Sequence, residues 1–438
     1  MINLTKIEDF AWDFTGVPLL LILGIYITWK SRFFQIRKMG TILKIFIEFF
    51  GPSKGERKGI HPIKLFLASV GGCVGIGNIV GICTAVQLGG PGALLWIWVT
   101  AIFGMILKYA EVYLGVKYRI SDQSGGYTGG PMIFIKKITS KAWVPFLISF
   151  LLCIYGIEIY QFRVIIDNIT ENWHGANHFL VTIVLLFSIL YAVNGGIKRV
   201  ANIASAIVPL FVFLFLGMGL WILVANIYSI PSILKMVFTE AFTGSAALGG
   251  FAGSTLIMTI SHGIRRASYS GDIGIGYASV IHSETSCHTP QKQATLAIVG
   301  IVLDTFIICT MSVLLILISG AWHENIPASI MVQRSLESTF PFMWFFMPFF
   351  MLLLGYSTIN AYFIVGIKCA QQISPEYGRG LYFSYAIFAF LAAAYLNTEE
   401  AQAIMAIAQV MLVVINGYAI YKLRNHISYD LEETPTSS

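Results

Sequence analysis

Two glycine-rich stretches interrupt apolar segments of this 438-residue chain, although glycine is a poor helix former. Residues 71–75 read GGCVG and residues 249–253 read GGFAG. Unwound backbone is tolerated inside a bilayer only where it lines a cavity or is buried in protein. Its free N–H groups suit a carboxylate, and its carbonyl oxygens suit a small hard cation. The two stretches therefore offer the chemistry of binding an anionic group beside a cation.

Close packing of helices is the alternative explanation for glycines at such spacing. A single pattern of this kind favours packing. Two copies of GGxxG in corresponding segments favour discontinuous helices, because paired glycine-interrupted helices are typical of a transporter's binding site.

The composition indicates that lipid surrounds these segments. Hydrophobic residues make up 56% of the chain, charged residues 11%, and the mean hydropathy is +0.75. Soluble domains carry about 25% charged residues, so the sequence predicts an all-α polytopic membrane protein. Six cysteines without CxxC spacing argue against a disulfide framework or a metal cluster. The chain contains no GxxxxGKS or GxxxxGKT pattern, so no ATP site is expected within it.

Hydropathy predicts eleven membrane helices, most of them near the roughly 20 residues that a bilayer requires. They lie near 14–29, 65–88, 92–116, 143–165, 178–193, 202–226, 245–264, 294–320, 341–367, 380–396 and 402–421. The first is interpreted as a retained helix because Glu8, Asp9 and Asp13 precede it, unlike the cationic start of a signal peptide.

The GGxxG stretches open two blocks of five predicted helices. An odd number of helices makes the second block enter the bilayer from the opposite face, which is an inverted repeat. We therefore expect an N-terminal part with an extra helix and a basic cytoplasmic loop (1–64), a first repeat (65–226), a second repeat (245–421) and a short cytoplasmic tail (422–438).

Basic residues concentrate on alternate connections between these helices. Most of the 28 lysines and arginines, including Arg265 and Arg266, fall on the side that also holds the C-terminus. Cytoplasmic loops are enriched in such residues. The sequence thus predicts a multi-pass protein of a bacterial or archaeal cell membrane, with its N-terminus outside and its C-terminus in the cytoplasm. Topology accounts for the net charge of +6, so no nucleic-acid partner is expected.

Several motifs resemble the signature of the alanine or glycine:cation symporter family. They follow in order over nearly the whole chain: VGIGNIVG (74–81), LGGPGALLWIWVTAIFGMILKYAEVYLGVKYR (88–119), GGPMIFI (129–135), GGIKRVA (195–201), AFTGSAALGGFAG (241–253), DTFIICTM (304–311) and STIN (357–360). The resemblance implies a fold similar to that of the bacterial leucine transporter. That fold has a five-plus-five inverted-repeat core with two discontinuous helices, here preceded by one extra helix.

The resemblance also implies roles for individual residues. The amides of Ile76 and Gly77 would hold a substrate carboxylate. The Na⁺ site would consist of the carbonyls of Gly71 and Val74 and the hydroxyls of Ser357 and Thr358. The remaining pocket residues would be Cys73, Gly75, Asn78, Gln161, Phe251 and Tyr362, of which the two aromatic residues limit substrate size.

Ionisable residues inside the predicted helices are costly and are candidates for function. Asp304 is interpreted either as a structural hydrogen-bonding residue or as part of proton or cation coupling. Lys108 and Glu111 lie three residues apart on one helix face and are interpreted as a pair, with gating as the alternative role of Glu111. Asp272 is a further candidate for coupling or gating, and Glu158 shares a helix face with the pocket candidate Gln161.

Histidines and acidic residues also crowd the stretch 262–288. Their spacing matches no HExxH-type metal motif, so a solvated loop is the expected explanation.

These features together imply a secondary active transporter, not an enzyme, that imports a small neutral amino acid, alanine or glycine, with Na⁺. No organic cofactor is expected. Residues 360–362 and Arg163 depart from the family's usual pattern, which leaves open the particular amino acid and its handedness. Proton coupling, a transporter-like sensor and a membrane-embedded enzyme are the alternatives.

Overall fold

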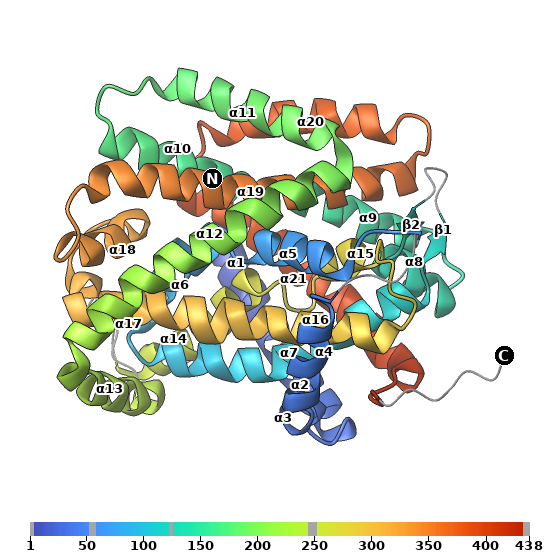
Figure 1. Ribbon diagram of the computed structural model, residues 1–438, viewed down its shortest axis with the longest axis horizontal. Helices are drawn as coiled ribbons and strands as arrows, with labels where there is room; N and C mark the ends of the chain where they lie inside the picture. The colour runs from blue at the N-terminus through green and yellow to red at the C-terminus, as the bar shows by residue number, and fades with distance from the viewer. Residues whose placement is uncertain (1–3, 52–57, 122–125, 244–251, 432–438) are drawn as a thin grey trace.

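A computed structural model describes residues 4–51, 58–121, 126–243 and 252–431. These ranges are almost entirely helical, with one antiparallel hairpin in which β1 (Ile120–Ser121) pairs with β2 (Tyr127–Thr128). Most long helices run side by side in one direction. The hairpin lies at one end of the molecule, and α13 (Ile230–Thr243) and α18 (Ala328–Glu337) lie at the other (Figure 1).

The other helices fall into two groups by type. The α-helices are α1 (Leu4–Ala11), α2 (Val17–Lys30), α3 (Phe34–Arg37), α4 (Met39–Glu48), α5 (Pro62–Cys73), α6 (Val80–Gly89), α7 (Ala93–Lys117), α8 (Pro131–Phe134), α9 (Trp143–Tyr155), α10 (Ile159–Asn172), α11 (His178–Asn194), α12 (Gly196–Ala225), α14 (Ala252–Ser270), α15 (Tyr277–His282), α16 (Pro290–Ile301), α17 (Thr310–Ser319), α19 (Met343–Ile373), α20 (Gly378–Ala393) and α21 (Thr398–Leu423). Short 3-10 or π segments are η1 (Trp12–Gly16), η2 (Ile76–Asn78), η3 (Ile135–Lys137), η4 (Ile227–Ser229), η5 (Val302–Cys309), η6 (Ala321–His323) and η7 (Arg424–His426).

The apolar length of these helices fits a bilayer. Seven of the described helices, or eight when the bent pair α5 and α6 counts as one span, are long and apolar enough to cross it. Large side chains such as Phe213, Trp221 and Phe388 are exposed on the outside of the bundle, as expected where lipid is the solvent. Each of the eleven predicted ranges overlaps a helix. However, α11 and α20 have only 17 and 16 residues, so the count of eleven stays a prediction.

The first glycine-rich stretch breaks a span, as the sequence predicts. Helix α5 ends at Cys73, and Gly75 is fully extended with φ −133° and ψ −161°. The Asn78 side chain then accepts a hydrogen bond from the Gly75 amide at 2.9 Å and helps to start the next half. The two halves are bent by 55°. Close packing of helices does not require backbone N–H groups such as that of Gly75 to leave the helix. The break therefore favours a binding role over packing as the explanation for these glycines.

A second break is present at a place that the sequence analysis does not predict. Residues 249–251 of GGFAG lie outside the described residues, and 252–270 form the unbroken helix α14. The chain is non-helical from 271 to 276, with positive φ at Asp272, Gly274 and Gly276, before α15 begins. The prediction of a kink at 249–253 stays a prediction, because residues 249–251 lie outside the described residues and α14 begins at Ala252. The break that is present has the sequence GDIGIG.

Two arginines assigned to a cytoplasmic loop also lie within α14. Arg265 and Arg266 are 5% and 7% exposed. The Arg265 guanidinium lies 2.6 Å from Asp9 Oδ1, and both arginines lie within 4 Å of Glu8 on α1. The loop assignment of these two residues is wrong, and acidic residues that precede the first span offset their charge. The excess of basic residues on the other connections is unchanged.

The stretch 262–288 is not a solvated loop. His262, Asp272, His282 and Glu284 are all buried, the last at 5% exposure. The solvated-loop interpretation fails because this stretch runs through α14, the second break and α15, which pack against α6, α7 and α5. No group of three or more metal-ligating side chains occurs in the described ranges.

Candidate functional site

The two breaks lie against each other inside the bundle, linked by three side chains. The Cys73 thiol donates to Asp272 Oδ2 at 2.9 Å. The Lys108 ammonium from α7 lies 2.9 Å from Cys73 Sγ and donates to the Gly271 carbonyl at 2.7 Å. A cation is stabilising at the C-terminal end of a helix, so Lys108 both ends α14 and, through Cys73, offsets the charge of Asp272.

Glu111 holds the other end of the second break. Its Oε2 accepts from the Gly276 amide and from the Asn416 side chain, both at 3.0 Å, and Asn416 also donates to the Gly274 carbonyl at 2.9 Å. Among the described hydrogen bonds, Lys108 and Glu111 thus have different partners. The prediction that they pair with each other is wrong, because the second break draws each of them to a different end.

Asp304 ties the first break to the π-helical segment η5. Its Oδ1 accepts from Asn78 Nδ2 at 2.6 Å, and its Oδ2 accepts from Thr305 Oγ1 at 2.7 Å. Asn78 in turn accepts from the Gly75 amide. Both carboxylate oxygens are therefore engaged, which favours the structural interpretation of Asp304 over a coupling role.

Oxygen atoms suited to Na⁺ gather where α19 crosses the first break. Thr358 Oγ1 donates to the Gly71 carbonyl at 2.9 Å. The Ser357 hydroxyl faces Gly71, since a Cβ built on this glycine would lie 2.7 Å from it, yet Ser357 Oγ is buried without a partner. Val74, the remaining predicted ligand, follows in the break and is fully buried. Neutral hydroxyl and carbonyl oxygens are ligands for hard cations, and such an ion would satisfy Ser357.

The amides predicted to bind a carboxylate lie beside Gln161 and Tyr269. Gln161 Oε1 accepts from the Ile76 amide at 3.3 Å. A Cβ on Gly77 would lie 3.2 Å from the Tyr269 ring. The structure therefore brings Gln161 of α10 to the first break, as predicted, and adds a ring from the end of α14.

Tyrosines form the wall of this region. Tyr362 stacks on Tyr277 with ring centroids 4.0 Å apart and meets Tyr155 edge-on at 5.4 Å. Tyr155 in turn packs edge-on against Tyr269. The predicted wall residue Tyr362 thus lies near the breaks, whereas Phe251 lies outside the described residues. Tyr155, Tyr269 and Tyr277 were not predicted, because isolated tyrosines in apolar helices give no distinguishing pattern.

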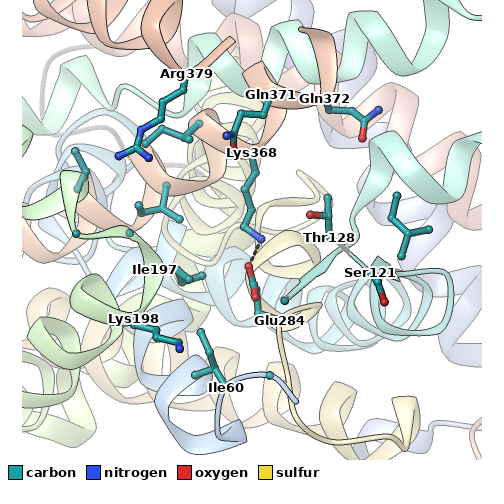
Figure 2. A pocket seen from close by; sticks show the side chains of 18 of the residues that line it. Ile60, Ser121, Thr128, Ile197, Lys198, Glu284, Lys368, Gln371, Gln372 and Arg379 are labelled. Carbon is teal, nitrogen blue, oxygen red and sulfur yellow. Dashed lines mark hydrogen bonds and ion pairs between the residues drawn. The ribbon is translucent and has the colours of Figure 1, made fainter. Parts of the chain in front are cut away.

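A cavity of about 970 Å³ lies elsewhere, beyond the end of α15 (Figure 2). Its lining includes Lys198, Gln371 and Arg379, and Lys368 reaches across it to form an ion pair with Glu284. Lys368 also donates to the Tyr127 carbonyl at 3.1 Å. None of the predicted substrate or Na⁺ residues lines this cavity.

The fold of this chain is also that of solved structures. The structure is similar to that of MhsT solved with L-phenylalanine, with a TM-score of 0.62 and 14% identity over 84% of this chain and 90% of that one. It is also similar to a nucleobase-cation-symport-1 family transporter in a closed conformation, with a TM-score of 0.56 and 14% identity over 85% and 81% of the two chains. The chain therefore shares the helical fold of these two proteins.

The sequence defines the family. The chain belongs to the sodium:alanine symporter family, whose model matches residues 2–434. It is 30% identical to the uncharacterized transporter YflA of Bacillus subtilis over 98% of this chain and 92% of the relative. It is 29% identical to the sodium/alanine symporter AgcS of Methanococcus maripaludis (86% and 84% covered) and 28% identical to the probable sodium/glutamine symporter GlnT of Bacillus subtilis (95% and 87%). The predicted family is confirmed, and it is a class of transporters rather than of enzymes.

Proposed function

We propose that this protein imports a small neutral amino acid, alanine or glycine, together with Na⁺. One observation carries the proposal: at the first break the Gly71 carbonyl meets the Thr358 hydroxyl, with the Ser357 hydroxyl facing the same glycine. Five residues further on, the Ile76 amide lies outside a regular α-helix and meets the side chain of Gln161. The first group suits a cation and the second suits a carboxylate. An ion and a carboxylate so placed neutralise each other partly, so each favours binding of the other.

Transport requires the site to open to each side in turn. We infer eleven spans in a five-plus-five inverted repeat, with the N-terminus outside and the C-terminus in the cytoplasm. On this topology, Lys198 and Arg379, which line the cavity of Figure 2, belong to cytoplasmic connections. The ion pair of Lys368 and Glu284 then links α19 to the segment after α15, two elements that rocking of one bundle against the other must separate.

The test is Na⁺-dependent counterflow in proteoliposomes. Vesicles preloaded with unlabelled alanine should accumulate labelled alanine in Na⁺, whereas vesicles in Li⁺ or choline should not. Linkage also requires Na⁺ to tighten alanine binding by the same factor that alanine tightens Na⁺ binding. Binding without exchange would indicate a sensor, and exchange indifferent to Na⁺ would indicate proton coupling. Competition by each of the twenty amino acids then identifies the substrate.

Removing both hydroxyls of the proposed ion site should weaken Na⁺ binding. The Ser357→Ala/Thr358→Ala variant should need roughly 10- to 100-fold more Na⁺ for half-maximal uptake, because each lost oxygen ligand is worth about 0.7–1.4 kcal/mol. Ser312→Ala is the matched control, because Ser312 bonds the Ile308 carbonyl of the preceding turn, at 3.1 Å, and lies on α17. Equal Na⁺ dependence in the double variant and the control would remove these hydroxyls from the ion site.

A further inference from the structure

Glu158 interrupts the span that carries Gln161. The residue lies between α9 and α10 in the left-handed conformation, with φ 53° and ψ 49°. This conformation is unfavourable for a residue other than glycine, and such strain persists where the surroundings enforce it, often at ligand sites. The side chain is completely buried. A strained backbone thus presents a carboxylate to the interior of a membrane protein.

The contacts of Glu158 place it at the proposed substrate pocket. Its Oε2 accepts a hydrogen bond from Tyr269 OH at 2.7 Å, and the Tyr269 ring lies against Gly77. The amide of Gln161, which holds Ile76, lies one turn further along the same helix and within reach of this carboxylate. Glu158 therefore lies close to the amides that would bind a substrate carboxylate.

The second oxygen of Glu158 has no partner. Oε1 is buried without a hydrogen bond, as are the hydroxyls of the neighbouring Tyr155 and Tyr277. A buried carboxylate oxygen without a donor is costly, so a ligand with several N–H donors would be favoured here. The protein's own cations do not meet this need, because none of the described ion pairs includes Glu158.

The partners of the other buried charges indicate what Glu158 is suited to bind. Lys108 and Asp272 offset each other through Cys73, and Asp304 is fully hydrogen-bonded. In the proposed complex, Na⁺ balances the carboxylate of the amino acid. The α-ammonium group is then left as a cation without a partner, and Glu158 is a buried carboxylate outside the described ion pairs. Glu111 is a second such carboxylate, but Gly276 and Asn416 hold it at the second break.

We propose that Glu158 is the counter-ion that accepts hydrogen bonds from the α-ammonium group of the transported amino acid. This assignment rests on the proposed function. It makes the protein selective for α-amino acids over 2-hydroxy acids of the same size, because a hydroxyl group brings one donor and no charge. Asp304 is excluded from this role because both of its oxygens accept hydrogen bonds. Asp272 also has one oxygen without a partner, but the Lys108 ammonium beside Cys73 already offsets its charge.

The experiment compares alanine with 2-hydroxypropanoate in equilibrium binding to the purified full-length protein in saturating Na⁺. Glu158→Gln should bind alanine roughly 10- to 100-fold more weakly than the native protein, since it loses a charge-assisted hydrogen bond. Its affinity for 2-hydroxypropanoate should change less than threefold. Glu111→Gln is the matched control, because Glu111 is also buried in a span but binds Gly276 and Asn416. It should keep the native ratio of the two affinities.

The possible failures are distinguishable. The role of Glu158 would be overturned if Glu158→Gln lost affinity equally for both ligands, or lost no affinity for alanine. Alanine binding by the native protein would still support the proposed function in that case. A native protein that binds none of the twenty amino acids would overturn both. If Glu158→Gln does not fold, Tyr269→Phe provides the test, because it removes the hydroxyl that orients the carboxylate. It should lower the ratio of alanine to 2-hydroxypropanoate affinity severalfold, and an unchanged ratio would count against the proposal.

Discussion

Replacing Gly75 with alanine should lower amino-acid uptake at least 100-fold. A Cβ at this position would lie 2.5 Å from Thr358 Oγ1 and 2.8 Å from Gln161 Oε1. These two atoms bond the Gly71 carbonyl and the Ile76 amide, respectively. A single added methyl group would therefore displace both Thr358 from the proposed ion site and Gln161 from the proposed carboxylate site. Overpacking costs about 1–3 kcal/mol, and two displaced hydrogen bonds add about 1 kcal/mol each. Uptake of labelled alanine in proteoliposomes measures the loss.

Gly81→Ala is the matched control for this variant. Gly81 lies in α6 of the same broken span and is buried, but no atom lies within 4 Å of a Cβ built there. Alanine is the better helix former by up to about 1 kcal/mol, so this variant should transport as well as the native protein and be at least as stable. Similar loss in both variants would show that the span tolerates no added methyl group. The loss of uptake in Gly75→Ala would then not be evidence for contacts of Gly75 with the proposed ion and carboxylate sites.

The first break was predictable because its sequence contains both the interruption and the means to restart the helix. Gly75 permits the extended backbone, and Asn78 three residues later supplies a side chain that accepts from its amide. The carboxylate-binding role of the Ile76 and Gly77 amides came instead from the family resemblance and stays a prediction, although both residues lie in the short segment η2 and not in a regular α-helix. A local pattern is sufficient where the residues that stabilise a feature are neighbours in the sequence.

The second break, at 271–276, was not predicted because its stabilising partners are remote in the sequence. GGFAG and GDIGIG contain equal numbers of glycines, so composition does not separate them. What distinguishes 271–276 is that Lys108 and Glu111 of α7 and Asn416 of α21 bind its backbone. Such contacts depend on tertiary packing. The one signal in the sequence was the pair of charged residues Lys108 and Glu111, three residues apart in an apolar segment. In the structure, Lys108 binds the start of the break at Gly271 and Glu111 binds its end at Gly276.

The same reason accounts for the error at Arg265 and Arg266. Local hydropathy treats two adjacent arginines as the end of a span. Glu8 and Asp9, more than 250 residues earlier, supply the charges that allow them to lie inside the bundle. Buried charge is tolerated when it is paired, and the sequence does not reveal pairs between distant helices.

Lys108→Met should destabilise the protein by about 3–5 kcal/mol, the usual cost of removing one partner of a buried charge pair. The substitution leaves Asp272 buried beside Cys73 without a compensating cation and removes the donor to the Gly271 carbonyl. Adding Asp272→Asn should restore much of the loss, because the double variant has no unpaired charge. Thermal unfolding in detergent, followed by the fraction of monodisperse protein, measures all three variants.

Lys198→Met, on an exposed lysine, is the control and should change stability by less than about 0.5 kcal/mol. If the effects of Lys108→Met and Asp272→Asn simply add in the double variant, the two charges are not coupled through Cys73. The second break would then depend on its glycines rather than on a buried cation.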